Sequence, residues 1–172
     1  MKLYRAKVLP IATDCIDTLV RDGDIEVEFA RRDEAIADVA AIMEDYLRRD
    51  MALREVIRDR MATDSVPYDQ YGKTRSKMAD ERMHPLGDDV ERFLARQTVE
   101  MLLNSPNVDE VFADDKTMYT KLLGLFRGHD VNEEEIREEA RGRIKNIAEG
   151  TVDYEIAMRN AVRDVKKRRG LV

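Results

Sequence analysis

The chain has 172 residues and a net charge of −6, with 38% charged and 43% hydrophobic residues. Because Cys15 is the single cysteine, a fold stabilised by internal disulfides is excluded. The acidic excess divides equally between residues 1–86 and 87–172, so neither half has the basic surplus that is typical of a nucleic-acid-binding domain.

Apolar runs are short throughout the chain. None approaches the ~20 residues that cross a membrane, and Asp14 and Asp17 interrupt the apolar stretch near the N-terminus, which therefore does not read as a signal peptide. Cys15 lies in that stretch without a neighbouring His or Lys to activate it, which favours a buried thiol. We therefore expect a cytoplasmic protein that contacts no membrane.

The first half of the chain has the pattern of helices. Gly and Pro are scarce, and apolar residues recur at helical spacing. The sequence predicts helices over Tyr4–Arg21, Asp33–Ala62 and Pro67–Met83, followed by a linker at residues 84–87. Apolar and acidic residues alternate over Ile25–Phe29, which indicates one short β-strand as the alternative to a loop there.

The second half predicts helices over Asp88–Asn104, Asp115–Arg127, Asn132–Glu149 and Asp153–Arg169. Asp88 with Glu91, and Asn132 with Glu135, have the spacing of a capping box. Gly128 is expected to end the helix that precedes Asn132. An all-α fold follows from these patterns.

The two halves of the chain resemble each other. Ser65–Arg82 matches Thr151–Arg168 at one fixed offset, and the apolar positions of Ile11–Val20 and Phe29–Met43 recur at an offset shorter by three residues. We therefore predict two tandem helical repeats of about 85 residues, longer than a typical solenoid unit. Residues 1–86 form the first and 87–172 the second, arranged as two lobes or as one bundle with a pseudo-twofold axis.

Tyr68 and Tyr154 occupy matching positions at the start of the last helix of each repeat. A tyrosine ring can pack against apolar neighbours while its hydroxyl group stays in water. We interpret both tyrosines as structural anchors that dock these helices.

Patterns that indicate catalysis or metal binding are weak. Glu81 and His84 have the spacing of a di-iron ligand pair, but the second repeat has no equivalent pair. Glu133–Glu135 opens a predicted helix, where negative charge complements the helix dipole. His84 and His129 are the only histidines, which disfavours a zinc cluster and a Ser-His-Asp site. The sequence therefore predicts no catalytic residue, no metal site and no cofactor.

Two groups of residues are candidate contact sites. A basic run at the end of the last helix complements the helix dipole or contacts RNA or DNA: Lys166, Lys167, Arg168 and Arg169. Three methionines are hard to bury at helical spacing and are candidates for an adaptable partner groove, with core filling as the alternative: Met51, Met78 and Met83.

Three stretches of the chain together resemble one bacterial family. They are Met1–Ala12 with Leu19–Glu28, then Tyr71–Asp89, then Arg143–Glu155. Their order is similar to that in the family called domain of unknown function 507, and the likeness covers essentially the whole chain. The resemblance implies a small cytoplasmic bacterial protein, and it supplies neither an activity nor catalytic residues.

These patterns favour a non-enzymatic helical interaction protein, an adaptor or assembly factor whose partner is another protein. Alternatively, the partner is a second copy of the same chain, which makes the protein a homo-oligomer. A second hypothesis is an RNA- or DNA-associated protein that uses the basic C-terminal helix. A third is an enzyme with carboxylates between the lobes, for which Asp88 and Asp89 are the candidates, although a helix cap explains both residues.

Overall fold

The computed structural model describes residues 1–144 and 147–171, and it is mostly α-helical, as predicted. The helices are α1 (Arg5–Arg21), α2 (Arg32–Thr63), α3 (Tyr71–Glu81), α4 (Asp89–Leu102), α5 (Asp115–Gly128), α6 (Glu133–Arg141) and α7 (Val152–Arg168). Two short 3-10 turns precede α2 and α3, namely η1 (Phe29–Arg31) and η2 (Tyr68–Gln70). The strands β1 (Ile25–Glu26) and β2 (Glu110–Val111) form one antiparallel ladder.

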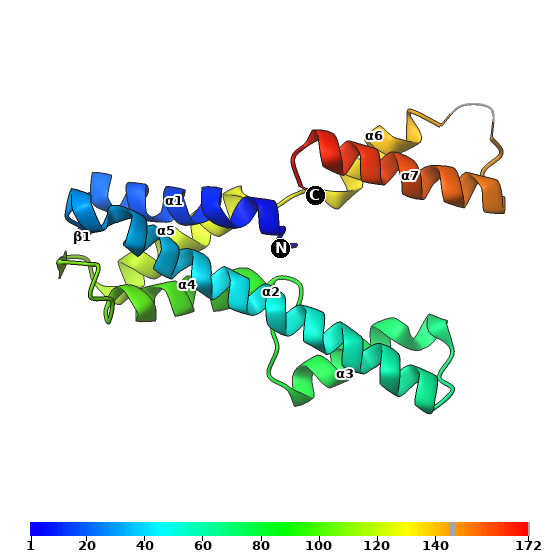
Figure 1. Ribbon diagram of the computed structural model, residues 1–172, viewed down its shortest axis with the longest axis horizontal. Coiled ribbons are helices and arrows are strands. Elements are labelled where there is room, and N and C mark those ends of the chain that lie inside the picture. Colours follow the sequence, from blue (N-terminus) through cyan, green and yellow to red (C-terminus); the bar gives the residue numbers. More distant parts are fainter. Residues whose placement is uncertain (145–146, 172) are drawn as a thin grey trace.

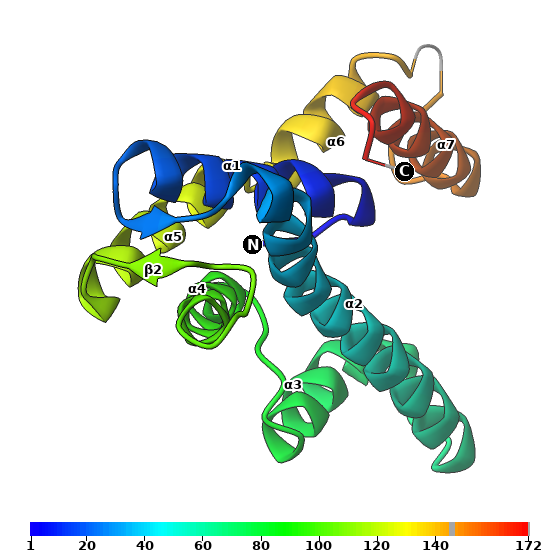
Figure 2. The ribbon, with the colours of Figure 1, turned by 60° about the vertical axis from the view of Figure 1, so that its left-hand side comes forward.

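A central bundle is formed by α1, the first half of α2, α4 and α5. The apolar stripes of these helices face one another, so Ile11, Leu19, Met43, Leu94 and Phe126 all lie in its core. β1 and β2 lie side by side across one end of this bundle (Figure 2).

Two helical arms leave the opposite end of the bundle and diverge (Figures 1 and 2). α2 is 32 residues long, which corresponds to about 48 Å, and its second half extends beyond the bundle. The α2–α3 arm is this second half packed on α3 through Leu53, Ile57, Met61, Met78 and Ala79. The α6–α7 arm is α6 packed on α7 through Ile136, Ala140 and Val165, together with Tyr4 and Leu171.

Short-range signals predicted several boundaries correctly. The break between α5 and α6 lies at the predicted position after Gly128, and the side chain of Asn132 accepts hydrogen bonds from the backbone N–H groups of Glu134 and Glu135. The strand suggested near Ile25 exists, but it ends at Glu26, and a 3-10 turn begins at Phe29. None of the helices in the described parts of the chain combines the length and apolar character that a membrane span needs.

Two predictions about helix ends were wrong. Asp88 precedes α4, but its side chain accepts no capping hydrogen bond, because the carbonyl groups of Leu86 and Gly87 accept from the first backbone N–H groups instead. α6 was predicted to continue to Glu149, but it ends at Arg141, where the weak helix former Gly142 follows. Residues 145 and 146 of that predicted helix lie outside the described residues.

Candidate functional site

A groove of about 1050 Å³ lies in the angle where the arms leave the bundle. The N-terminal segment, the middle of α2, α3 and Leu171 form its walls. Its lining has large apolar side chains: Leu3, Tyr46, Leu47, Met51, Tyr71 and Leu171. Its charged lining consists of Lys2, Arg5, Arg54 and Arg75 with the carboxylate Asp50. The groove is therefore apolar and predominantly basic, in a chain whose net charge is −6.

Asp50 is a buried charge in the wall of this groove, with 6% of its surface exposed. Its Oδ2 lies 2.7 Å from Nη2 of Arg54, one turn later on α2. Its Oδ1 accepts a hydrogen bond of 2.9 Å from Nη2 of Arg75 on α3. Two guanidinium groups thus compensate the loss of hydration of one carboxylate, and the Arg75 bond ties the two helices of the α2–α3 arm together.

His84 and Tyr46 cover the other side of Asp50. Their rings stack with centroids 4.9 Å apart, and His84 Nε2 lies 3.4 Å from Asp50 Oδ1 without a hydrogen-bond partner among the described residues. Burial lowers the pKa of His84 below its usual 6.5, although the Asp50 carboxylate acts in the opposite direction. Burial and Asp50 together raise the pKa of Tyr46 to about 12. Both rings are therefore neutral near pH 7, and neither presents an exposed nucleophile or base.

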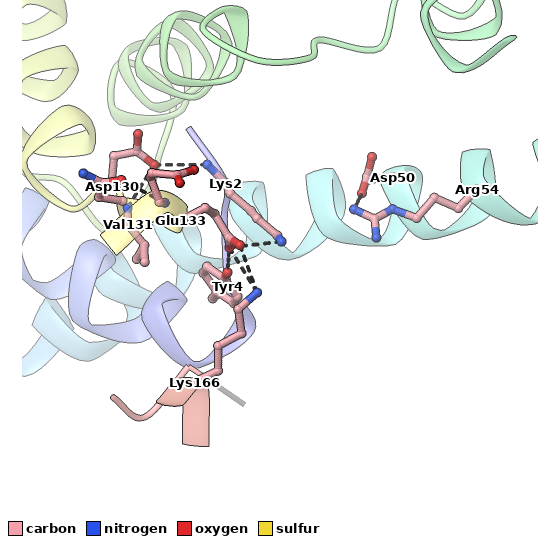
Figure 3. Close-up of polar contacts among 10 residues, drawn as sticks. Lys2, Tyr4, Asp50, Arg54, Asp130, Val131, Glu133 and Lys166 are labelled. Atoms are coloured by element: carbon pink, nitrogen blue, oxygen red, sulfur yellow. Dashed lines mark hydrogen bonds and ion pairs between the residues drawn. The ribbon is translucent and has the colours of Figure 1, made fainter. Parts of the chain in front are cut away.

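A second polar cluster joins the N-terminal segment to the α6–α7 arm. Lys2 Nζ and Lys166 Nζ each lie 3.1 Å from a Glu133 carboxylate oxygen, and the Tyr4 hydroxyl group donates to the same carboxylate. Figure 3 shows these side chains converging on Glu133. Asp50 and Arg54 lie on α2, away from this cluster. Burial alone would raise the pKa of Glu133, but the two ammonium groups outweigh it and the pKa is lowered. The cluster therefore holds the arm by charge.

The basic run at the end of α7 faces acidic residues of α6. Besides Lys166, the guanidinium of Arg169 lies 2.8 Å from Glu139 and that of Arg168 lies 3.9 Å from the same carboxylate. Lys167 is exposed. Most of the charge that was a candidate for nucleic-acid contact is thus paired within the arm.

The structure does not bring the three candidate methionines together. Met51 is 63% exposed and lines the groove. Met78 is buried in the core of the α2–α3 arm. Met83 is exposed after α3, beside a separate hollow of about 370 Å³ that includes His84.

The two candidate anchor tyrosines have different surroundings. Tyr68 is 85% exposed and stacks on Tyr71, with ring centroids 5.9 Å apart. It is Tyr71 that packs against the core of the α2–α3 arm. Tyr154 is half-buried, and its hydroxyl group donates a 3.1 Å hydrogen bond to Glu149.

The carboxylates considered for an enzyme lie on the surface. Asp88 and Asp89 are both exposed at the start of α4, and Asp89 lies 3.2 Å from Arg92 of the next turn. Within residues 1–144 and 147–171, no three His, Cys, Asp or Glu side chains gather in a way that could hold a metal ion.

Sequence reasoning missed the cluster around Asp50. Asp50 and Arg54 have the spacing that predicts an ion pair on one face of a helix. Nothing local indicated that Arg75 and His84, which lie 25 and 34 positions later, would reach the same carboxylate. That contact depends on how α3 folds back along α2.

Comparisons with known proteins agree with the resemblance in the sequence. Among curated proteins, none matches the chain. A family model described as "Protein of unknown function (DUF507)" matches residues 1–171. The chain therefore belongs to the DUF507 family.

Proposed function

We propose that the protein is a non-enzymatic adaptor or assembly factor of the cytoplasm that binds a segment of a partner protein in the groove between its arms. The observation that carries this proposal is the lining of the groove, where four basic side chains accompany one carboxylate and a largely apolar wall. Charge complementarity selects partners and steers their approach. The partner segment that suits such a lining has acidic and large apolar side chains.

Met51 gives the groove a second property that favours a protein partner. It is 63% exposed at the groove, and its flexible, polarisable side chain can adapt to differently shaped surfaces. Tyr71, which is half-buried, adds aromatic surface with little rotational freedom to lose. An exposed, partly aromatic and basic groove therefore fits a peptide segment better than it fits an enclosed small molecule.

We infer that the two halves of the chain, 1–86 and 87–172, are tandem repeats related by a pseudo-twofold axis. Each half has the order helix, strand, helix, and each then continues into a helical hairpin that forms one arm. On this view, the two arms are related units that have diverged in sequence. Because their sequences have diverged, the two arms present chemically different walls of the groove to one partner.

An RNA or DNA partner is the competing proposal. It would use the basic end of α7, but Lys166, Arg168 and Arg169 already pair with Glu133 and Glu139. Neutralised side chains release fewer counterions on binding a phosphate backbone, which weakens that attraction. Lys2, Arg54 and Arg75 of the groove are paired as well, so ion pairing does not separate the two proposals. The apolar lining of the groove and the exposed Met51 favour the protein partner.

The test is affinity copurification from lysate with wild type and Met51→Glu, each divided into nuclease-treated and untreated halves. Met51 is largely exposed, so the substitution leaves the core intact and adds a carboxylate that repels an acidic partner. Val152→Glu is the matched control, because Val152 is 74% exposed on α7 and does not line the groove.

We expect wild type and Val152→Glu to retain the same proteins in both halves, and Met51→Glu to lose them. Proteins that disappear after nuclease treatment of the wild-type sample would favour the nucleic-acid proposal instead. Unchanged retention by Met51→Glu would rule out the groove as the binding site.

A further inference from the structure

The end of the bundle remote from the arms exposes two phenylalanines. Phe29 is 94% exposed and Phe112 is 58% exposed. Phe29 follows β1 and Phe112 directly follows β2. Because Ile25 pairs with Val111 in an antiparallel ladder, the two phenylalanines lie at opposite ends of that ladder. The two strands lie at the end of the bundle opposite to the arms (Figures 1 and 2).

The same end of the bundle is strongly acidic. Residues 22–29 and 107–115, which contain the two strands, include no basic residue. Their carboxylates are Asp22, Asp24, Glu26, Glu28, Asp109, Glu110, Asp114 and Asp115. We use the name acidic tip for the exposed residues Glu26, Glu28, Phe29, Glu110, Phe112 and Asp115.

Part of this negative charge is compensated by basic side chains from neighbouring helices. Lys121 of α5 lies 3.1 Å from Asp22 and 2.5 Å from Asp24, and Arg31 lies 3.4 Å from Glu28. In the described part of the chain, no basic side chain forms an ion pair with Glu26 or Glu110. The acidic tip therefore keeps an uncompensated negative field between two exposed rings.

Glu26 and Glu110 lie directly opposite each other on adjacent strands. Like charges in that position destabilise a strand pair. Phe112 follows Glu110 by two residues, directly after β2, and its N–H group donates to the Asp24 carbonyl group. The extended backbone therefore places Glu110 and Phe112 on the same face. The fold thus retains a repulsive carboxylate pair beside an exposed aromatic ring, a combination that local stability does not favour and that is typical of a functional surface.

We propose that the acidic tip is a second docking surface, whose occupant is a segment of a partner protein with basic and large apolar side chains. Such a segment neutralises Glu26 and Glu110 and covers Phe29 and Phe112. Its charge preference is opposite to that of the basic groove, so the two surfaces select different partners. None of the residues of the acidic tip lines the groove, which allows both surfaces to be occupied at once.

The binding test uses two fluorescein-labelled helical peptides, one of leucine and lysine and one with glutamate in place of each lysine. Fluorescence anisotropy is measured with wild type, Phe29→Ser, Phe112→Ser and the control Val152→Ser. Val152 is an apolar residue on the α6–α7 arm whose exposed fraction, 74%, lies between those of the two phenylalanines. We expect the lysine peptide alone to bind wild type and control, with affinity reduced about tenfold by each phenylalanine substitution.

A second measurement distinguishes function from structure. Glu110→Gln removes the repulsion across the ladder, so we expect a higher urea midpoint of unfolding together with weaker binding of the lysine peptide. A residue with only a structural role would not change the two properties in opposite directions.

Three results would overturn the proposal. One is equal binding of the lysine peptide by wild type and both phenylalanine variants, which would indicate unspecific attraction to an acidic protein. Another is the absence of binding to wild type. The third is self-association in sedimentation velocity that the phenylalanine substitutions abolish, which would identify a second copy of the chain as the occupant.

Discussion

Asp50 lies where α2 leaves the bundle, and its neighbours explain how a carboxylate can be buried there. Removing a charge from water costs several kcal/mol, about as much as a well-placed opposite charge returns. Arg54 and Arg75 supply two such charges, and their side chains are only partly buried, with 49% and 31% exposed. The cluster is thus a stable junction that also gives the groove its basic character.

Asp50→Ala should destabilise the α2–α3 arm. The substitution leaves two guanidinium groups without their shared acceptor and removes the carboxylate that lies 3.4 Å from His84, so we expect a loss of about 1–3 kcal/mol in the free energy of unfolding. Urea unfolding monitored by circular dichroism measures it. Asp45→Ala is the matched control on the exposed face of the same helix, where pairs with Arg48 and Arg49 contribute about 0–1 kcal/mol. Equal effects of the two substitutions would contradict the role assigned to the buried cluster.

The end of a helix could be predicted from the sequence where the residues next to that end determine it. Asn132 follows a break and precedes three glutamates, and it caps α6 as its sequence indicates. Asp88 has the same local signature, but the tight linker through Leu86 and Gly87 offers backbone carbonyl groups to the first turn of α4. A side-chain cap and a backbone turn compete for the same N–H groups, and the sequence near Asp88 does not reveal which one prevails.

Asn132→Ala should open α6 locally. The substitution removes the acceptor of the Glu134 and Glu135 N–H groups, at a cost of about 1 kcal/mol. α6 has nine residues, so this loss should speed hydrogen exchange of the amides at 133–141 by about fivefold. Exchange measured by mass spectrometry tests this, with Asp88→Ala as the control that should leave the amides of α4 unchanged. Faster exchange in α4 of Asp88→Ala would show that Asp88 acts as a cap in solution.

For the whole molecule, the sequence predicted the helices and the break between α5 and α6, but not the groove. Helical periodicity identifies which face of a helix is apolar, and it contains no information about the partner that covers that face. The groove combines Lys2 and Tyr4 with Met51, Arg75 and Leu171, whose proximity depends on the directions of the two arms. Those directions are set by contacts between segments that are distant in the chain.

Tyr4 connects the N-terminal segment to the α6–α7 arm through both apolar packing and a hydrogen bond. It is 8% exposed, it packs with Ile136 and Val165 in the core of that arm, and its hydroxyl group donates to Glu133. Tyr4→Ala removes both contacts, and truncation of a large core side chain costs about 3–5 kcal/mol. We expect the arm to detach from its position while the bundle, whose core excludes Tyr4, stays folded.

Detachment of the α6–α7 arm can be measured as a change in the distance between two spin labels. One label is attached at Arg58→Cys on α2 and the other at Arg159→Cys on α7, which are both exposed positions. Burial raises the pKa of Cys15 to about 12, so the native thiol stays unlabelled. Electron–electron distance measurements should give one narrow distribution for the otherwise wild-type chain and for Tyr68→Ala, whose tyrosine is exposed. They should give a broad distribution for Tyr4→Ala. A narrow distribution in Tyr4→Ala, or loss of hydrogen-exchange protection in α1 and α4, would show that Tyr4 does not hold the arm independently of the bundle.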